Sequence, residues 1–139
     1  MIVLDTYVLS EMLREDPDPS VVCWIDGNAE SVMVTTSVTR AELMYGIEIM
    51  PSGRRRDLLR RVAENVFDIE LGGRLLVFDR DAADAFAVIR SIRRAASLPV
   101  GVADVMIAAI AHSRRATLAT RNVRDFVGCG VDIVNPWTC

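Results

Sequence analysis

The chain has 139 residues, half of them apolar and a quarter charged, with a formal net charge of −3. This length and balance predict one globular domain, residues 1–139. No apolar run approaches the ~20 residues that a membrane-spanning helix needs. Asp5 also interrupts the first hydrophobic stretch too early for a signal peptide. A cytoplasmic protein is therefore expected.

The side-chain inventory excludes several kinds of chemistry. All sixteen basic residues are arginine, so a phosphate-binding P-loop and Schiff-base catalysis lack their lysine. His112 is the single histidine. It is expected at a helix C-terminus rather than in a catalytic triad. Cys23, Cys129 and Cys139 show no metal-ligand spacing and are expected to be free thiols. Carboxylates remain as the expected chemistry.

Short runs of β-branched and apolar residues predict strands, and apolar residues that return every three or four positions predict helices. Ser20 is the expected cap of the second helix. In chain order the pattern predicts strand 2–4, helix 6–14, helix 20–27, strand 32–34, helix 38–50, helix 54–71, strand 75–78, helix 80–97, helix 102–112, strand 117–119 and strand 131–134. Strands separated by helices indicate an α/β fold with a mainly parallel sheet between two helical layers.

Four carboxylates stand at or near expected helix starts: Asp5, Glu42, Asp104 and Asp125. Each has a structural alternative. Asp5 can cap the helix after the first strand, and Asp104 suits the positive end of a helix dipole. Glu42 completes a Thr39-x-x-Glu42 capping-box pattern, and Asp125 completes an Asn122-x-x-Asp125 cap.

Together these acids indicate a metal site. The carboxyl ends of parallel strands meet at one edge of the sheet, so three of these helix starts should lie there. Carboxylates brought together repel one another unless a cation is present. Hard oxygen ligands favour Mg²⁺ or Mn²⁺, and such an ion can activate water against a phosphoryl group. Asp79 and Asp81 also follow a strand, and position alone does not separate Asp79 from the other four acids.

Several segments, taken in order, resemble the PIN-domain family, and within it the VapC/FitB-like toxins of bacterial toxin–antitoxin pairs. The ordered set spans nearly the whole chain. Its pieces are Ile2-Val3-Leu4-Asp5-Thr6 with Val8-Leu9-Ser10-Glu11, Thr39-Arg40-Ala41-Glu42-Leu43 with Gly46, Ala103-Asp104 with Ile107-Ala108-Ala109, Thr117-Leu118-Ala119-Thr120-Arg121-Asn122, Asp125-Phe126, and Asn135-Pro136-Trp137.

The resemblance implies a Mg²⁺-dependent endoribonuclease that hydrolyses RNA, with Mn²⁺ as a substitute ion. Asp5, Glu42 and Asp104 match the metal-binding acids of the family. The fourth acid commonly follows the Thr-Arg pair, where this chain has Asn122. Some members carry it three residues later, as Asp125 stands here. Asp79 is not among the metal acids of the family.

Polar supports complete the expected site. Thr6, Thr120 and Ser37 are candidates, with helix-end or turn hydroxyls as the structural alternative, and Asn122 is a possible neutral helper. Tyr7 departs from the family, which normally reads Asp-Thr-Asn at this point. A catalytically weakened PIN module that mainly binds its antitoxin is therefore one alternative, and a DNA-directed nuclease is another.

The resemblance also implies two protein partners, a small VapB-like antitoxin that can insert an arginine among the acids, and a second copy in a homodimer. The RNA contact is less defined. Residues 54–61 carry five arginines against Asp57. Arg54, Arg55 and Arg56 can follow an RNA backbone, and a solvated helix face is the alternative.

Overall fold

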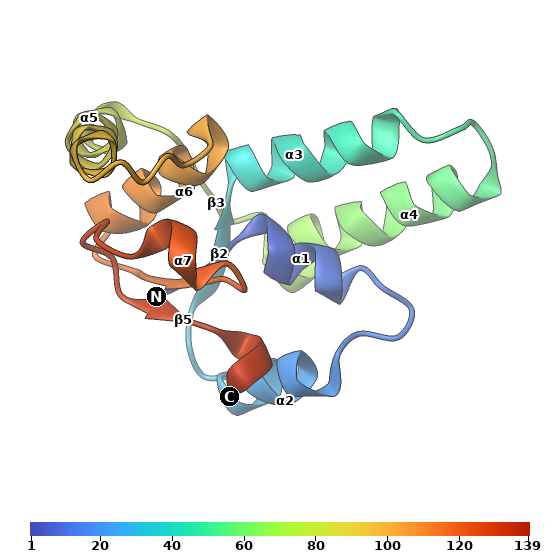
Figure 1. The fold of residues 1–139 in the computed structure, drawn as a ribbon. Coiled ribbons are helices and arrows are strands. Elements are labelled where there is room, and N and C mark those ends of the chain that lie inside the picture. The colour runs from blue at the N-terminus through green and yellow to red at the C-terminus, as the bar shows by residue number, and fades with distance from the viewer.

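The computed structural model of the protein describes residues 1–139 (Figure 1). No helix in it is both long and apolar enough to cross a bilayer. The elements in chain order are β1 (Ile2–Leu4), α1 (Thr6–Met12), α2 (Pro19–Gly27), β2 (Met33–Thr36), α3 (Ser37–Glu48), α4 (Arg54–Asn65), a π-helical turn (Val66–Glu70), β3 (Leu75–Leu76), α5 (Arg80–Ala95), α6 (Val102–Ser113), β4 (Thr117–Ala119), α7 (Val123–Phe126), β5 (Ile133–Val134) and a 3-10 turn (Pro136–Thr138).

The five strands form one sheet in the order β3-β2-β1-β4-β5. Every neighbouring pair is parallel, and Val3 of β1 lies beside Val34 on one side and Leu118 on the other. The chain therefore leaves β1 towards β2 and later returns to β4 on the opposite side. In such sheets the crevice at the carboxyl ends of the central strands is the usual ligand site.

Alternate residues of the strands face two separate cores. Val3 and Leu118 pack with α5, α6 and Phe126 of α7 in one core. Leu4 and Ala119 pack with α1, α2, α4 and the π-helical turn in the other. In Figure 1, α5 and α6 lie on one side of the strands and α1 and α4 on the other. The predicted three-layer α/β/α class with a short parallel sheet is confirmed.

Helix ends differ from the sequence predictions where local hydrogen bonding decides. Asp18, rather than Ser20, caps α2, because its carboxylate accepts from the Ser20 amide at 2.8 Å and Pro19 suits the first helical position. The expected helix 54–71 changes to a π-helical turn at Val66. There the Leu71 amide donates to the Val66 carbonyl at 2.9 Å, and both Val66 and Phe67 reach the core.

Three of the remaining helices end earlier than predicted and both edge strands are shorter, whereas β2 extends to Thr36 and α6 to Ser113. The helices expected over 6–14, 38–50 and 80–97 run over Thr6–Met12, Ser37–Glu48 and Arg80–Ala95, respectively. The strands expected over 75–78 and 131–134 keep only Leu75–Leu76 and Ile133–Val134, because these two edge strands each have a pairing partner on one side only. All helices and strands that the sequence predicts are present.

Candidate active site

Asp5 stands at the carboxyl end of the central strand and is only 2% exposed. Its carboxylate caps α1 by accepting from the Val8 amide at 2.9 Å, so the helix cap that the sequence offered as an alternative for Asp5 is present. Its own amide donates to the Ala119 carbonyl of β4 at 3.1 Å. Two neighbouring segments therefore fix the position of this buried acid.

The environment of Asp5 favours its protonated form. Burial raises the pKa of Asp5 from 3.8 to about 6, with a smaller rise from the charge of Asp104. Hydrogen bonds from the Thr120 hydroxyl and from the Val8 and Tyr7 amides act in the opposite direction and do not cancel the burial. Keeping Asp5 ionised at this buried position therefore costs free energy, and a nearby cation would offset that cost.

Asp104 is the acid that links the others. It lies in the first turn of α6, whose N-cap Gly101 offers no side chain. Burial raises the pKa of Asp104, and the charges of Glu42 and Asp125 raise it further. No protein group donates a hydrogen bond to its carboxylate in the structure. Asp104 therefore interacts electrostatically with all three other predicted acids and keeps its oxygens free.

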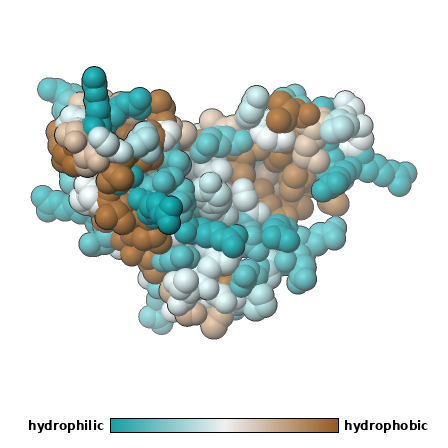
Figure 2. Space-filling view, viewed as in Figure 1, coloured by the Kyte–Doolittle hydropathy of each residue, from teal (hydrophilic) through white to brown (hydrophobic).

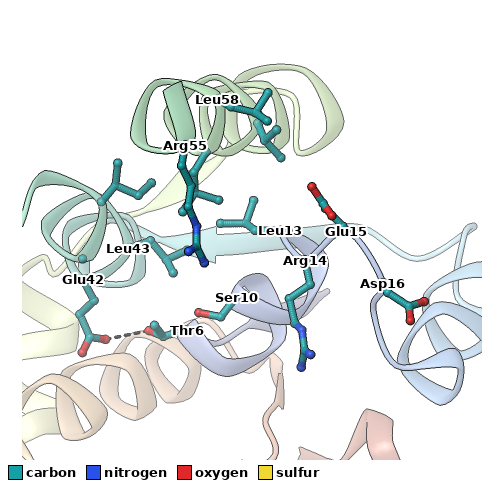
Figure 3. Close-up of a pocket in the computed structure, with 14 residues that line it drawn as sticks. Thr6, Ser10, Leu13, Arg14, Glu15, Asp16, Glu42, Leu43, Arg55 and Leu58 are labelled. Carbon is teal, nitrogen blue, oxygen red and sulfur yellow. Dashed lines mark hydrogen bonds between the residues drawn. The ribbon is translucent and has the colours of Figure 1, made fainter. Parts of the chain in front are cut away.

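Glu42 reaches the site from α3 through a group of threonines. The Thr6 hydroxyl donates to its carboxylate at 2.7 Å (Figure 3). The predicted capping box at Thr39 is wrong, because Thr36 caps α3 by accepting from the Thr39 amide at 3.0 Å. Glu42 is left inside the helix with its side chain free to face Thr6.

Thr36 and Thr39 are supporting residues that sequence reasoning did not assign. Both are fully buried, and the hydroxyls of Thr6 and Thr36 lie 3.4 and 3.2 Å from that of Thr39. The three side chains join the start of α1 to the start of α3. The run of threonines and serine at residues 35–37 was the available signal, since hydroxyls at a strand end commonly bond to nearby backbone.

Asp125 and Asn122 form a pair at the end of β4. The Asn122 side-chain amide donates to the Asp125 carboxylate. The backbone amide of Asn122 donates to the Thr120 hydroxyl oxygen at 3.0 Å. Asn122 makes no side-chain cap of α7, so the predicted cap is replaced by a contact between the two side chains. The structure thus connects Thr120 to both Asp5 and Asn122.

The structure separates Asp79 from these acids. Its carboxylate caps α5 by accepting from the Ala82 amide at 3.0 Å and forms an ion pair with Arg114 at 2.7 Å. Both oxygens are engaged in these structural contacts. Asp79 also does not contribute to the pKa shifts of Asp5 or Asp104. Asp79 therefore differs from the other four acids in having both oxygens bound within the protein.

The four acids are chemically suited to a divalent cation, although no three of them form a compact ligand group. Thr6 holds Glu42 and Asn122 holds Asp125, each by one hydrogen bond. The donor set consists of hard carboxylate oxygens, which suit Mg²⁺ or Mn²⁺. The mutual charges that raise the pKa of Asp104 are those that a bound cation would neutralise.

The other residues that the sequence singled out have defined places. His112 lies in the last turn of α6, where its Nδ1 is 3.0 Å from the Gly130 carbonyl, as expected for a helix C-terminus. Tyr7 is half exposed. Arg55 lines a groove next to Glu42 (Figure 3), whereas Arg56 donates to the Met50 carbonyl at 3.4 Å. The three cysteines are free thiols, as predicted.

Comparison with known proteins gives consistent matches over the full chain. The PIN domain family matches residues 2–127. VapC ribonuclease Y4jK of Sinorhizobium fredii is 38% identical over 99% of this chain and 98% of its own length. Toxin FitB of Neisseria gonorrhoeae is 35% identical, with 99% of each chain covered.

A solved structure of FitAB bound to a DNA fragment superimposes with a TM-score of 0.90 at 34% identity, covering 99% of this chain and 96% of that one. Other similar solved structures are toxin–antitoxin complexes of the VapBC family. The chain therefore belongs to the PIN-domain family, among the VapC and FitB toxins of toxin–antitoxin systems.

Proposed function

We propose that this chain is a Mg²⁺-dependent endoribonuclease, the toxin of a toxin–antitoxin pair, and that Asp5, Glu42, Asp104 and Asp125 form its metal-binding centre. The observation that carries the proposal is the electrostatic coupling of Asp104 with the other three acids at the end of the central strands. The similarity to a VapC ribonuclease supports RNA as the substrate.

The acids have different places in this mechanism. Asp5 and Asp104 would hold the ion directly, because Asp5 is fixed by its backbone contacts and Asp104 accepts no protein hydrogen bond. Glu42 and Asp125 would hold a second ion or orient the attacking water. When bound, the divalent ion activates water and neutralises charge on the phosphoryl oxygen.

The supporting groups set the orientation of these carboxylates. The Thr6 hydroxyl donates to one oxygen of Glu42 and leaves the other for the reaction. Asn122 does the same for Asp125. The Thr120 hydroxyl holds Asp5 and also accepts from the Asn122 amide, so it joins two of the acids. Such outer hydrogen bonds commonly decide metal affinity and activity.

The function is tested by incubating the purified chain with total RNA, with and without Mg²⁺, beside the Asp104→Asn variant. Cleavage of RNA that needs the ion and is lost in the variant supports the proposal. A matched single-stranded DNA substrate tests the DNA-directed alternative. Equal cleavage of RNA and DNA, or full activity of Asp104→Asn, contradicts the proposal.

The proposed antitoxin contact is a groove between α1, α3 and α4, with a volume of about 940 Å³. Glu42 and Thr6 stand at one end, and apolar side chains such as Leu43 and Leu58 line its walls (Figure 3). Figure 2 shows hydrophobic residues in the recess between α3 and α4. An antitoxin segment with an apolar face and an arginine near Glu42 fits this surface. Leu58→Glu should weaken binding of the co-expressed antitoxin, because it places a charge on the apolar wall of the groove.

The proposed RNA contacts are Arg54 and Arg55, which are exposed at the start of α4. Arg56 is less suited, since it is partly buried and donates to the Met50 carbonyl.

The proposed homodimer surface is the outward side of α5, where Val88 and Ile92 are 58% and 48% exposed one turn apart. Sedimentation of Ile92→Glu tests the dimer, and the variant should be monomeric.

A further inference from the structure

Arg93, in the last turn of α5, is a buried arginine without an acidic partner. It is 5% exposed, and none of the four ion pairs in the structure includes it. Burying a guanidinium is costly unless hydrogen bonds replace its water. The partners of Arg93 are backbone carbonyls on two segments that follow different elements.

The first segment is the connection from α5 to α6. The Arg93 Nε donates to the Leu98 carbonyl at 3.1 Å, and the Leu98 amide donates back to the Arg93 carbonyl at 2.9 Å. Between them Ser97 has a φ of +56°, a left-handed conformation that costs a non-glycine residue roughly 1–2 kcal/mol. Arg93 therefore holds a strained connection from both sides. That connection leads into the first turn of α6, which carries Asp104.

The second segment is the turn after α7. The Arg93 Nη1 donates to the Val127 carbonyl at 2.5 Å. Val127 ends α7, the short helix that carries Asp125. The turn is closed by the Cys129 amide, which donates to the Phe126 carbonyl at 3.2 Å. One side chain thus joins the segment that enters the Asp104 helix to the segment that leaves the Asp125 helix.

We propose that Arg93 is a positioning residue for the acid centre, because its buried guanidinium fixes the segments of Asp104 and Asp125 relative to each other. This inference rests on the proposed function of those acids. Arg93 acts through position and not through its charge, because it is not among the causes that shift the pKa of Asp104. That pKa is raised by burial and by the charges of Glu42 and Asp125. A lysine ammonium retains the charge, but it cannot reproduce the planar fork that reaches two carbonyls.

The test compares Arg93→Lys with Arg94→Lys, which changes the adjacent, exposed arginine of the same turn. Amide hydrogen exchange is measured over residues 98–105 and 123–129, together with Mn²⁺ affinity by calorimetry and RNA cleavage. In Arg93→Lys both segments should lose protection together. Mn²⁺ affinity should fall about 10-fold or more, and kcat should fall more than KM rises. Arg94→Lys should match the unmutated chain.

The inference is overturned if Arg93→Lys loosens only the α5–α6 connection and keeps Mn²⁺ affinity within about twofold. If Arg93→Lys does not fold, Arg93→Ala is examined with added methylguanidinium. Restored exchange protection with methylguanidinium, but not with methylammonium, supports the inference; equal behaviour of the two overturns it. If the unmutated chain binds no Mn²⁺, the proposed function fails, and hydrogen exchange alone decides the coupling through Arg93.

Discussion

Two of the four acids in the site are held by short polar side chains from α1 and from the loop before α7. Thr6 donates to Glu42, and Asn122 donates to Asp125. Asp104 has no such donor, and its pKa is raised by burial and by both of these neighbours. Asp104 is therefore the carboxylate with the fewest hydrogen bonds, and it interacts electrostatically with the other three acids. This freedom suits a ligand that must adjust to an ion.

The raised pKa of Asp5 predicts a pH-dependent stability of the metal-free chain. The folded-state pKa is about 6 and the ordinary value is 3.8, so the folded chain binds more protons between these values. The stabilising contribution of Asp5 should therefore be fully present below about pH 4 and be lost as the pH rises through 6. This loss lowers the free energy of unfolding by about 3 kcal/mol. Asp5→Asn retains a cap for Val8 and removes this loss.

Thermal melts of the metal-free chain at pH 5 and pH 7.5 measure the effect. Asp5→Asn should melt several degrees higher than the unmutated chain at pH 7.5, and the difference should shrink at pH 5. A variant that is equally or less stable at pH 7.5 would show that burial of the Asp5 carboxylate carries no such penalty.

Thr6 holds the carboxylate of Glu42 by one hydrogen bond. Thr6→Val removes the hydroxyl that donates to Glu42 and keeps the size of the side chain. The rate of RNA cleavage should fall by about 10-fold or more, because Glu42 loses its orientation. Ser10→Ala is the control, since Ser10 lines the same groove one turn later on α1. Equal rates for both variants would remove Thr6 from the site.

The start of α5 resembles the acid-bearing helix starts, but its acid Asp79 is engaged in a helix cap and an ion pair. Asp79→Ala should lose the cap at Ala82 and the ion pair with Arg114. We expect a loss of about 1–2 kcal/mol in unfolding free energy and unchanged RNA cleavage well below the melting temperature. Chemical denaturation and a cleavage assay measure the two. A selective loss of cleavage would make Asp79 part of the site.

The order of elements was predictable because the pattern of apolar residues is strong along the chain. The run at residues 2–4 and the helix 102–112 are clear examples, and the structure places β1 and α6 there. Helix ends were less predictable. Asp18, Ser20 and Thr36 are all acceptable caps by residue type, and only the path of the backbone decides which one meets a free amide.

The candidate site was predictable only in part, because some of its contacts join residues that are distant in sequence. Asp5 and Asp104 follow from strand ends and helix starts. Asp79 satisfies the same rule, and its exclusion needs Arg114, which is distant in sequence. The role of Arg93 was also out of reach, since its hydrogen bonds depend on where Leu98 and Val127 meet in space.

The strand order places Asp5, Glu42 and Asp125 on segments that follow three neighbouring strands. β1 lies between β2 and β4, so the segments that follow these strands share one edge of the sheet. α6 completes the site by placing its first turn at that edge, while α3 and α4 extend away from it to form the wall of the groove (Figure 1). Substrate, ion and antitoxin are therefore proposed to meet at one crevice.

A divalent cation among these acids would relieve their mutual repulsion, and a calorimetric titration with Mn²⁺ measures its binding. The unmutated chain should bind the ion, release protons at pH 6, where Asp5 is partly protonated, and melt at a higher temperature in its presence. Asp104→Asn should bind at least 10-fold more weakly, and Asp79→Asn should bind as the unmutated chain does. Equal Mn²⁺ affinity in all three proteins, or no binding by any of them, would show that these acids form no cation site.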